Sequence, residues 1–76
     1  MDVKAKIIEI SNDMWPQLDI ENVIGIVDNN LVDSFDIVTF IGELKDTFDV
    51  EIGPEDILPG NFNTLDAMVA LVERKL

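Results

Sequence analysis

The residues whose types and spacing draw attention first are a serine between two aspartates, in the stretch Asp33-Ser34-Phe35-Asp36. Taken alone, a serine at the start of an apolar-periodic segment is typical of a helix N-cap, whose side-chain oxygen accepts a backbone N–H bond. The chain has no cysteine and no histidine. Nucleophilic triads, imidazole acid–base catalysis, disulfides and thiolate zinc sites are therefore excluded. Ser34 remains the residue whose surroundings need explanation.

Two other patterns fail as sites. Asp28-Asn29-Asn30 could open a calcium loop, but Asp33 stands where such a loop requires glycine and Thr39 where it requires glutamate. Carboxylates are numerous, yet they are spread along the chain, which is typical of a solvated surface and not of a catalytic pair. There is also no glycine-rich phosphate loop. We expect neither a catalytic residue nor a metal site.

Composition limits the class of protein. The chain has 76 residues, so we expect a single domain over residues 1–76. Its apolar residues, 47% of the chain, must build the core without help from disulfides or bound metals. The net charge is −11, and Lys45 is the only base between Asp28 and Asp66. Such a surface repels nucleic acid and anionic lipid and favours partners with basic patches. No apolar run approaches a membrane span or a signal peptide, so we expect a cytoplasmic monomer.

Helical periodicity predicts an all-α fold. A first helix should run from Asp2 to about Met14. Asp2 is suited to be its N-cap, and Pro16 should end it because proline disfavours helical angles at the residue before it. Residues 16–33 then form a long connection, in which we interpret residues 23–27 as an apolar loop lying across the core. A second helix should begin at Asp33 or Ser34 and end near Phe48. Its apolar stripe consists of Ile37, Ile41, Leu44 and Phe48.

The carboxyl-terminal part should hold one short and one long helix. Pro54 suits the first position of the short helix, and we expect Pro59-Gly60 to end it. Asn63 should then cap the last helix and pair with Asp66 in a capping box. The stripe of that helix is predicted to consist of Leu65, Met68, Val69, Val72 and Leu76. The prediction is a small four-helix bundle with a long loop between its first two helices.

The stretch around Ser34 resembles the Asp-Ser-Leu signature of acyl carrier proteins. The similarity extends from about Asp28 to the carboxyl end, whereas the first 27 residues match only as a helix and a loop. Similar residues occupy Asp33-Ser34-Phe35-Asp36, Val38, Leu44, Phe48-Asp49, Glu51-Ile52 and Asn63-Thr64. The resemblance implies that 4′-phosphopantetheine is esterified to Ser34 and that its thiol carries acyl groups as thioesters. It also implies that the protein catalyses nothing itself.

The resemblance leaves the cargo open. Val32, Phe35, Thr39 and Lys45 depart from the residues typical of fatty-acid carriers. The stretch from Leu31 to Phe35, with Phe-Asn-Thr near the last helix, is somewhat more similar to D-alanyl carriers. The alternatives are thus a carrier for fatty acid biosynthesis, a D-alanyl or other aminoacyl carrier, or an acidic helical adaptor for which Ser34 is only a cap.

The partners implied by the resemblance are a magnesium-dependent phosphopantetheinyl transferase, acyl- or aminoacyl-loading ligases, and acyl-processing enzymes with basic docking patches. A helical projection of about 100° per residue places several residues of the second helix away from its core stripe. Phe35 is among them, and it could instead fold under the long loop; both interpretations stay open. The expected recognition surface consists of Asp33, Phe35, Asp36, Thr39, Glu43 and Asp46.

Overall fold

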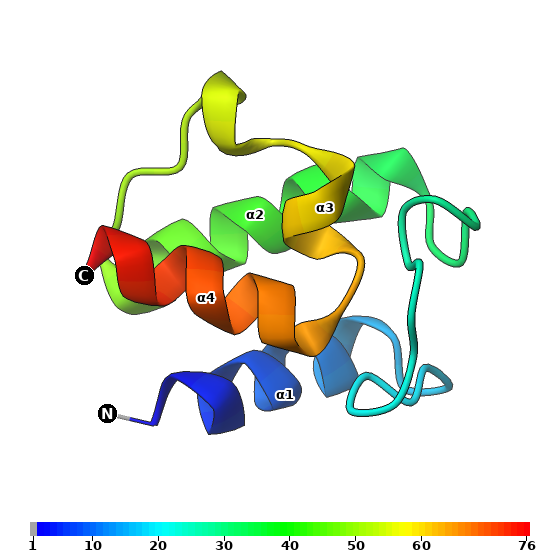
Figure 1. Ribbon diagram of the computed structural model, residues 1–76. Coiled ribbons are helices and arrows are strands. Elements are labelled where there is room, and N and C mark those ends of the chain that lie inside the picture. Colours follow the sequence, from blue (N-terminus) through cyan, green and yellow to red (C-terminus); the bar gives the residue numbers. More distant parts are fainter. Residues whose placement is uncertain (1) are drawn as a thin grey trace.

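The computed structural model describes residues 2–76, and within that range all regular structure is helical (Figure 1). The three long helices are α1 (Val3–Met14), α2 (Ser34–Phe48) and α4 (Leu65–Lys75). Two short elements lie between α2 and α4, the 3-10 turn η1 (Pro54–Asp56) and the one-turn helix α3 (Pro59–Phe62). The predicted helical bundle with a long first loop is confirmed.

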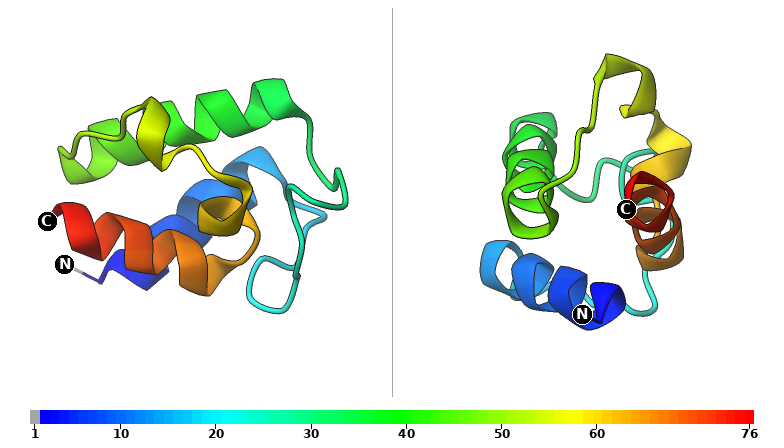
Figure 2. Two further views of the ribbon diagram at one scale, coloured as in Figure 1. Left: turned by 45° about the horizontal axis from the view of Figure 1, so that its top comes forward. Right: turned by 90° about the vertical axis from the view of Figure 1, so that its left-hand side faces the viewer.

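The long helices are arranged around α1, which packs against both α2 and α4. Both of these helices run opposite to α1 (Figure 1). In the right-hand view of Figure 2, α2 and α4 stand on either side above α1, and the connection through η1 and α3 covers the side opposite α1. Both chain ends lie at one end of the bundle, and the loop of residues 16–33 lies at the other (Figures 1 and 2). The start of α2 is therefore at the loop end.

Local signals explain α1. Asp2 is its N-cap, and Oδ1 accepts a hydrogen bond from the Ala5 N–H at 3.1 Å. Trp15, directly before Pro16, ends the helix, as predicted from the restriction that proline places on the preceding residue. The indole of Trp15 is buried and packs on Phe40 of α2, with ring centroids 5.1 Å apart. This aromatic pair joins the end of α1 to the middle of α2.

The loop of residues 16–33 contributes to the core without forming a strand. Ile20 and Ile26 are buried, whereas Ile24 is exposed. The loop turns at Gly25, whose φ of 67° favours glycine, and again at Asn30, whose φ is 52°. The interpretation of residues 23–27 as an apolar loop is confirmed.

Helix α2 supplies one side of the core. All four residues of its predicted stripe are buried, together with Phe40. The helix ends at Asp49, which adopts the left-handed conformation and donates its N–H to the Lys45 carbonyl. No helix within residues 2–76 is both long and apolar enough to cross a membrane.

Three predictions for the carboxyl-terminal part are wrong. Pro59 does not end a helix but occupies the first position of α3, because a proline that cannot continue one helix is equally suited to begin the next. Asn63 is not the cap of α4, since Thr64 is, with Oγ1 accepting the Ala67 N–H at 3.1 Å. Leu76 lies beyond α4 and is exposed, while Leu71 is buried in its place.

Candidate functional site

Ser34 is the first residue of α2, and Asp33 before it is the N-cap. The interpretation of Ser34 as the cap is therefore wrong. Asp33 has extended backbone angles and its side chain makes no capping hydrogen bond. Ser34 itself is exposed. Its hydroxyl is thus accessible at the amino end of a long helix that no side chain caps.

The electrostatics of this helix end favour an anion. The free N–H groups of the first turn and the helix dipole together attract negative charge. Two carboxylates oppose this attraction. Asp33 is exposed, and Asp36 is half-buried with Oδ2 lying 3.5 Å from Nε1 of Trp15, at the long limit of a hydrogen bond. An accessible hydroxyl beside unsatisfied N–H groups fits a phosphate ester on Ser34.

An apolar groove of about 240 Å³ begins beside Ser34. Its first wall comes from the loop before α2, its floor from α2, and its second wall from the segment around α3. The sequence did not predict this groove, because the second wall belongs to no periodic stripe. The lining residues are Val27, Asn30, Val32, Ser34, Ile37, Val38, Ile57, Leu58, Pro59 and Phe62.

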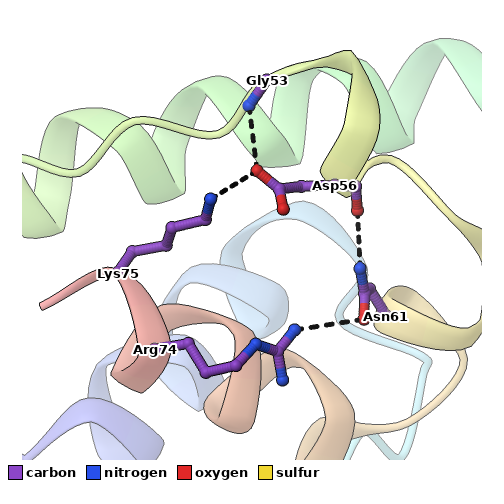
Figure 3. A network of polar contacts seen from close by, with 5 residues as sticks. All are labelled: Gly53, Asp56, Asn61, Arg74 and Lys75. Atoms are coloured by element: carbon purple, nitrogen blue, oxygen red, sulfur yellow. Dashed lines mark hydrogen bonds and ion pairs between the residues drawn. The ribbon is translucent and has the colours of Figure 1, made fainter.

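A polar network ties the second wall to the end of α4 (Figure 3). Nζ of Lys75 lies 2.6 Å from Oδ2 of Asp56, and the same oxygen accepts the Gly53 N–H at 3.2 Å. Asn61 donates to the Asp56 carbonyl at 2.7 Å and accepts from Arg74 at 3.4 Å. The hydrogen bond from Lys75 is the main cause that lowers the pKa of Asp56 below its ordinary value. Segment 53–61 is thereby held in place.

The structure places the expected recognition residues around Ser34 and along α2. Phe35 is 77% exposed, so its exposed interpretation is the correct one. Thr39, Glu43 and Asp46 are also exposed, whereas Asp36 is less accessible. The sequence did not reveal the exposed apolar side chains of Val38, Ile57 and Leu58, which line the groove beside Ser34. Exposed side chains of this kind together mark an interaction surface more strongly than single ones.

A second hollow, of about 200 Å³, lies where α1 meets α2. Thr39 and Glu43 line it from α2, and Asp13 lines it from α1 with Ile10 and Met14. Asp13 therefore extends the acidic surface of α2 onto α1, which spacing within one helix could not reveal. Among residues 2–76, no three acidic side chains converge in the manner of a metal site.

Comparison with known proteins finds a family match over the part of the chain that contains Ser34. The family model described as "Phosphopantetheine attachment site" matches residues 32–72, more than half of the chain, from just before α2 to near the end of α4. The chain thus belongs to the phosphopantetheine attachment site family, whose cofactor is covalently attached 4′-phosphopantetheine.

A curated relative supports the same class. The chain is 44% identical over 45 residues to the "Probable acyl carrier protein PigG" of Serratia sp. (strain ATCC 39006). The aligned region is 59% of this chain and 52% of that protein, so the match spans about half the length of the relative.

Proposed function

We propose that Ser34 is the attachment residue for 4′-phosphopantetheine and that the protein carries acyl groups between partner enzymes. The observation that carries the proposal is the position of Ser34, exposed at the first position of α2 on a helix end where no side chain makes a capping hydrogen bond. This serine lies within the region that the family model matches. The attached group supplies a terminal thiol that holds the cargo as a thioester.

The residues around Ser34 have distinct tasks in this proposal. The first-turn N–H groups of α2 stabilise the negative phosphodiester and offset repulsion from Asp33 and Asp36. Glu43 and Asp46, both exposed on α2, attract partner enzymes that present basic residues. Phe35 and Val38 offer apolar contact to the same partners. We expect these partners to be a phosphopantetheinyl transferase, a loading ligase and acyl-processing enzymes, met in the cytoplasm by a monomeric carrier.

The test uses the whole protein with coenzyme A, magnesium and a broad-specificity phosphopantetheinyl transferase. The expected result is a mass gain of one phosphopantetheine, located on Ser34 by peptide mapping. The second serine, Ser11, is an internal control, because it is buried and donates to the Ile8 carbonyl at 3.0 Å. Ser34→Ala should remain folded and gain nothing. An unmodified wild type, with a control carrier modified in parallel, would favour the adaptor without a prosthetic group.

The cargo has a second candidate, an aminoacyl group such as D-alanine. The observation in its favour is the similarity of Leu31 to Phe35 and of Phe62-Asn63-Thr64 to D-alanyl carriers. To distinguish the acyl cargo from the aminoacyl cargo, the modified protein is offered to an acyl ligase with fatty acids and to an aminoacyl ligase with D-alanine. Intact mass then reports which thioester forms. Loading by the aminoacyl ligase alone would assign the protein to the aminoacyl carriers.

A further inference from the structure

The side chain of Asn63 joins two segments that are far apart in sequence. Its Oδ1 accepts hydrogen bonds from the N–H of Val27 at 2.9 Å and from the N–H of Asp28 at 3.0 Å. Its Nδ2 donates to Oδ2 of Asp28 at 3.0 Å. The Asn63 carbonyl also accepts the Ile26 N–H at 3.1 Å. We call these four bonds between Asn63 and residues 26–28 the Asn63 clasp.

The clasp explains why an amide stands at this position. The start of α4 does not need it, because Thr64 is the cap, and the helical backbone angles of Asn63, φ −76° and ψ −22°, suit almost any residue. The partners on the loop need an acceptor for two N–H groups and a donor for a carboxylate. An asparagine side chain offers both at its tip. An aspartate would instead place a second carboxylate against Asp28.

The clasped loop leads directly to Ser34. Leu31 donates its N–H to the Ile26 carbonyl at 3.0 Å, which closes the turn three residues before Ser34. Val27, inside this turn, lines the groove beside Ser34. Phe62, next to Asn63 in the chain, lines the same groove. The clasp therefore joins the loop to the α3–α4 junction on one side of the attachment serine.

We propose that Asn63 is a positioning residue for the modification of Ser34. It holds residues 26–31 in the conformation that presents the Ser34 hydroxyl and the first turn of α2 to the transferase. This inference rests on the proposed function of Ser34. Because the loop has no regular secondary structure of its own, removing the three side-chain bonds of the clasp should loosen its backbone at Val27 and Asp28. Helix α2 and the backbone bond from Ile26 to the Asn63 carbonyl should remain.

The first experiment compares Asn63→Ala with Thr64→Ala. The two residues are adjacent. Asn63→Ala removes the side-chain hydrogen bonds to the loop, whereas Thr64→Ala removes the bond that caps α4. We expect Asn63→Ala to lower kcat/KM for phosphopantetheine transfer by about 10- to 100-fold, since misplacement of a reacting group by about 1 Å can cost roughly 100-fold. Thr64→Ala should be modified at close to the wild-type rate. Both are assayed below their melting temperatures, with circular dichroism confirming the fold.

The second experiment exchanges the donor and the acceptor. Asn63→Asp alone sets two carboxylates against each other and should slow modification. Combined with Asp28→Asn, the exchanged pair restores a hydrogen bond of reversed direction, and the rate should recover. Recovery would show that the contact between residues 28 and 63, and not the presence of an amide at position 63, sets the rate. The exchange also remains informative if Asn63→Ala fails to fold.

Amide hydrogen exchange provides a readout that does not depend on modification. The N–H groups of Val27 and Asp28 should lose protection in Asn63→Ala and keep it in Thr64→Ala. If the wild type is not modified at Ser34, the proposed function fails and this inference with it. If the wild type is modified and Asn63→Ala is modified as fast as Thr64→Ala, the positioning role alone is overturned. A double variant that stays slow would overturn it as well.

Discussion

The ammonium of Lys75 lies 2.6 Å from a carboxylate oxygen of Asp56, which fastens the last turn of α4 to the 3-10 turn η1. Both side chains are mostly buried, with relative exposures of 27% and 16%. The contact attaches the segment of residues 49–58, which has little helical structure, to the end of α4. It also holds the segment that forms the second wall of the groove beside Ser34.

The first prediction concerns pH. The pKa of Asp56 is lower in the folded state than its value of about 3.9 in an unfolded chain. The unfolded state therefore binds the proton more readily, so this group stabilises the fold above that unfolded value, and the contribution is lost as pH falls through the folded pKa. Asp56→Asn should melt at a lower temperature than the wild type at pH 7, and the difference should vanish in acid.

Glu51→Gln is the matched control for Asp56, because Glu51 is an exposed carboxylate of the same connection and forms no ion pair within residues 2–76. Thermal melts between pH 7 and pH 2 should give nearly parallel curves for Glu51→Gln and the wild type. A difference for Asp56→Asn that persists unchanged into acid would contradict the role of the carboxylate charge.

The second prediction concerns salt. A net charge of −11 on 76 residues destabilises the compact state by self-repulsion, which salt screens over about 10 Å at 0.1 M. Sodium chloride or a few millimolar magnesium should raise the melting temperature. Differential scanning calorimetry at increasing salt is the measurement. A melting temperature that is flat or falling would show that the acids are already compensated within the fold.

The third prediction concerns Phe35. This side chain is 77% exposed, so Phe35→Ala should leave the melting temperature nearly unchanged. If Phe35 anchors a partner enzyme, the same variant should weaken binding by about 2 kcal/mol, through faster dissociation. Surface plasmon resonance against the transferase measures both rates. If folded Phe35→Ala dissociates from the transferase at the wild-type rate, Phe35 is not part of the recognition surface.

The fourth prediction concerns the acids of α2. Glu43 and Asp46 are exposed, so reversing both charges to lysine should slow association and weaken its dependence on salt. Dissociation should change little, because charges at the rim of an interface act mainly on encounter. Reversing Glu73, an exposed acid on α4, is the control. An equal effect from Glu73 would mean that net charge, and not the α2 surface, attracts the partner.

The fifth prediction concerns the core. Phe40 is fully buried and packs on Trp15, so Phe40→Ala should cost about 3–5 kcal/mol of folding free energy. A domain of this size has a total stability of only roughly 4–11 kcal/mol. Urea titration followed by Trp15 fluorescence measures the loss. A cost below about 1 kcal/mol would show that the core repacks around the missing ring.

Much of the fold could be predicted because its signals are local. Asp2 and Pro16 bound α1, and the spacing from Ile37 to Phe48 defines the buried face of α2. Caps, proline and apolar period depend on residues within one or two turns of each other. The prediction of the α4 cap failed because two residues were equally suited to one local task. Asn63 and Thr64 are both good caps, and the local pattern could not decide between them.

By itself, the sequence determined the helix plan, the acidic surface and Ser34 as the residue of interest, since each depends on residue types and short-range spacing. The tertiary structure decided which side chains form hydrogen bonds and ion pairs with the connecting segments. It assigned Asn63 to the N–H groups of Val27 and Asp28, and it brought Lys75 to Asp56 across the second half of the fold. Backbone groups and charges that folding removes from water require partners within the protein. Which residue meets that requirement depends on how the helices pack, and local sequence does not encode it.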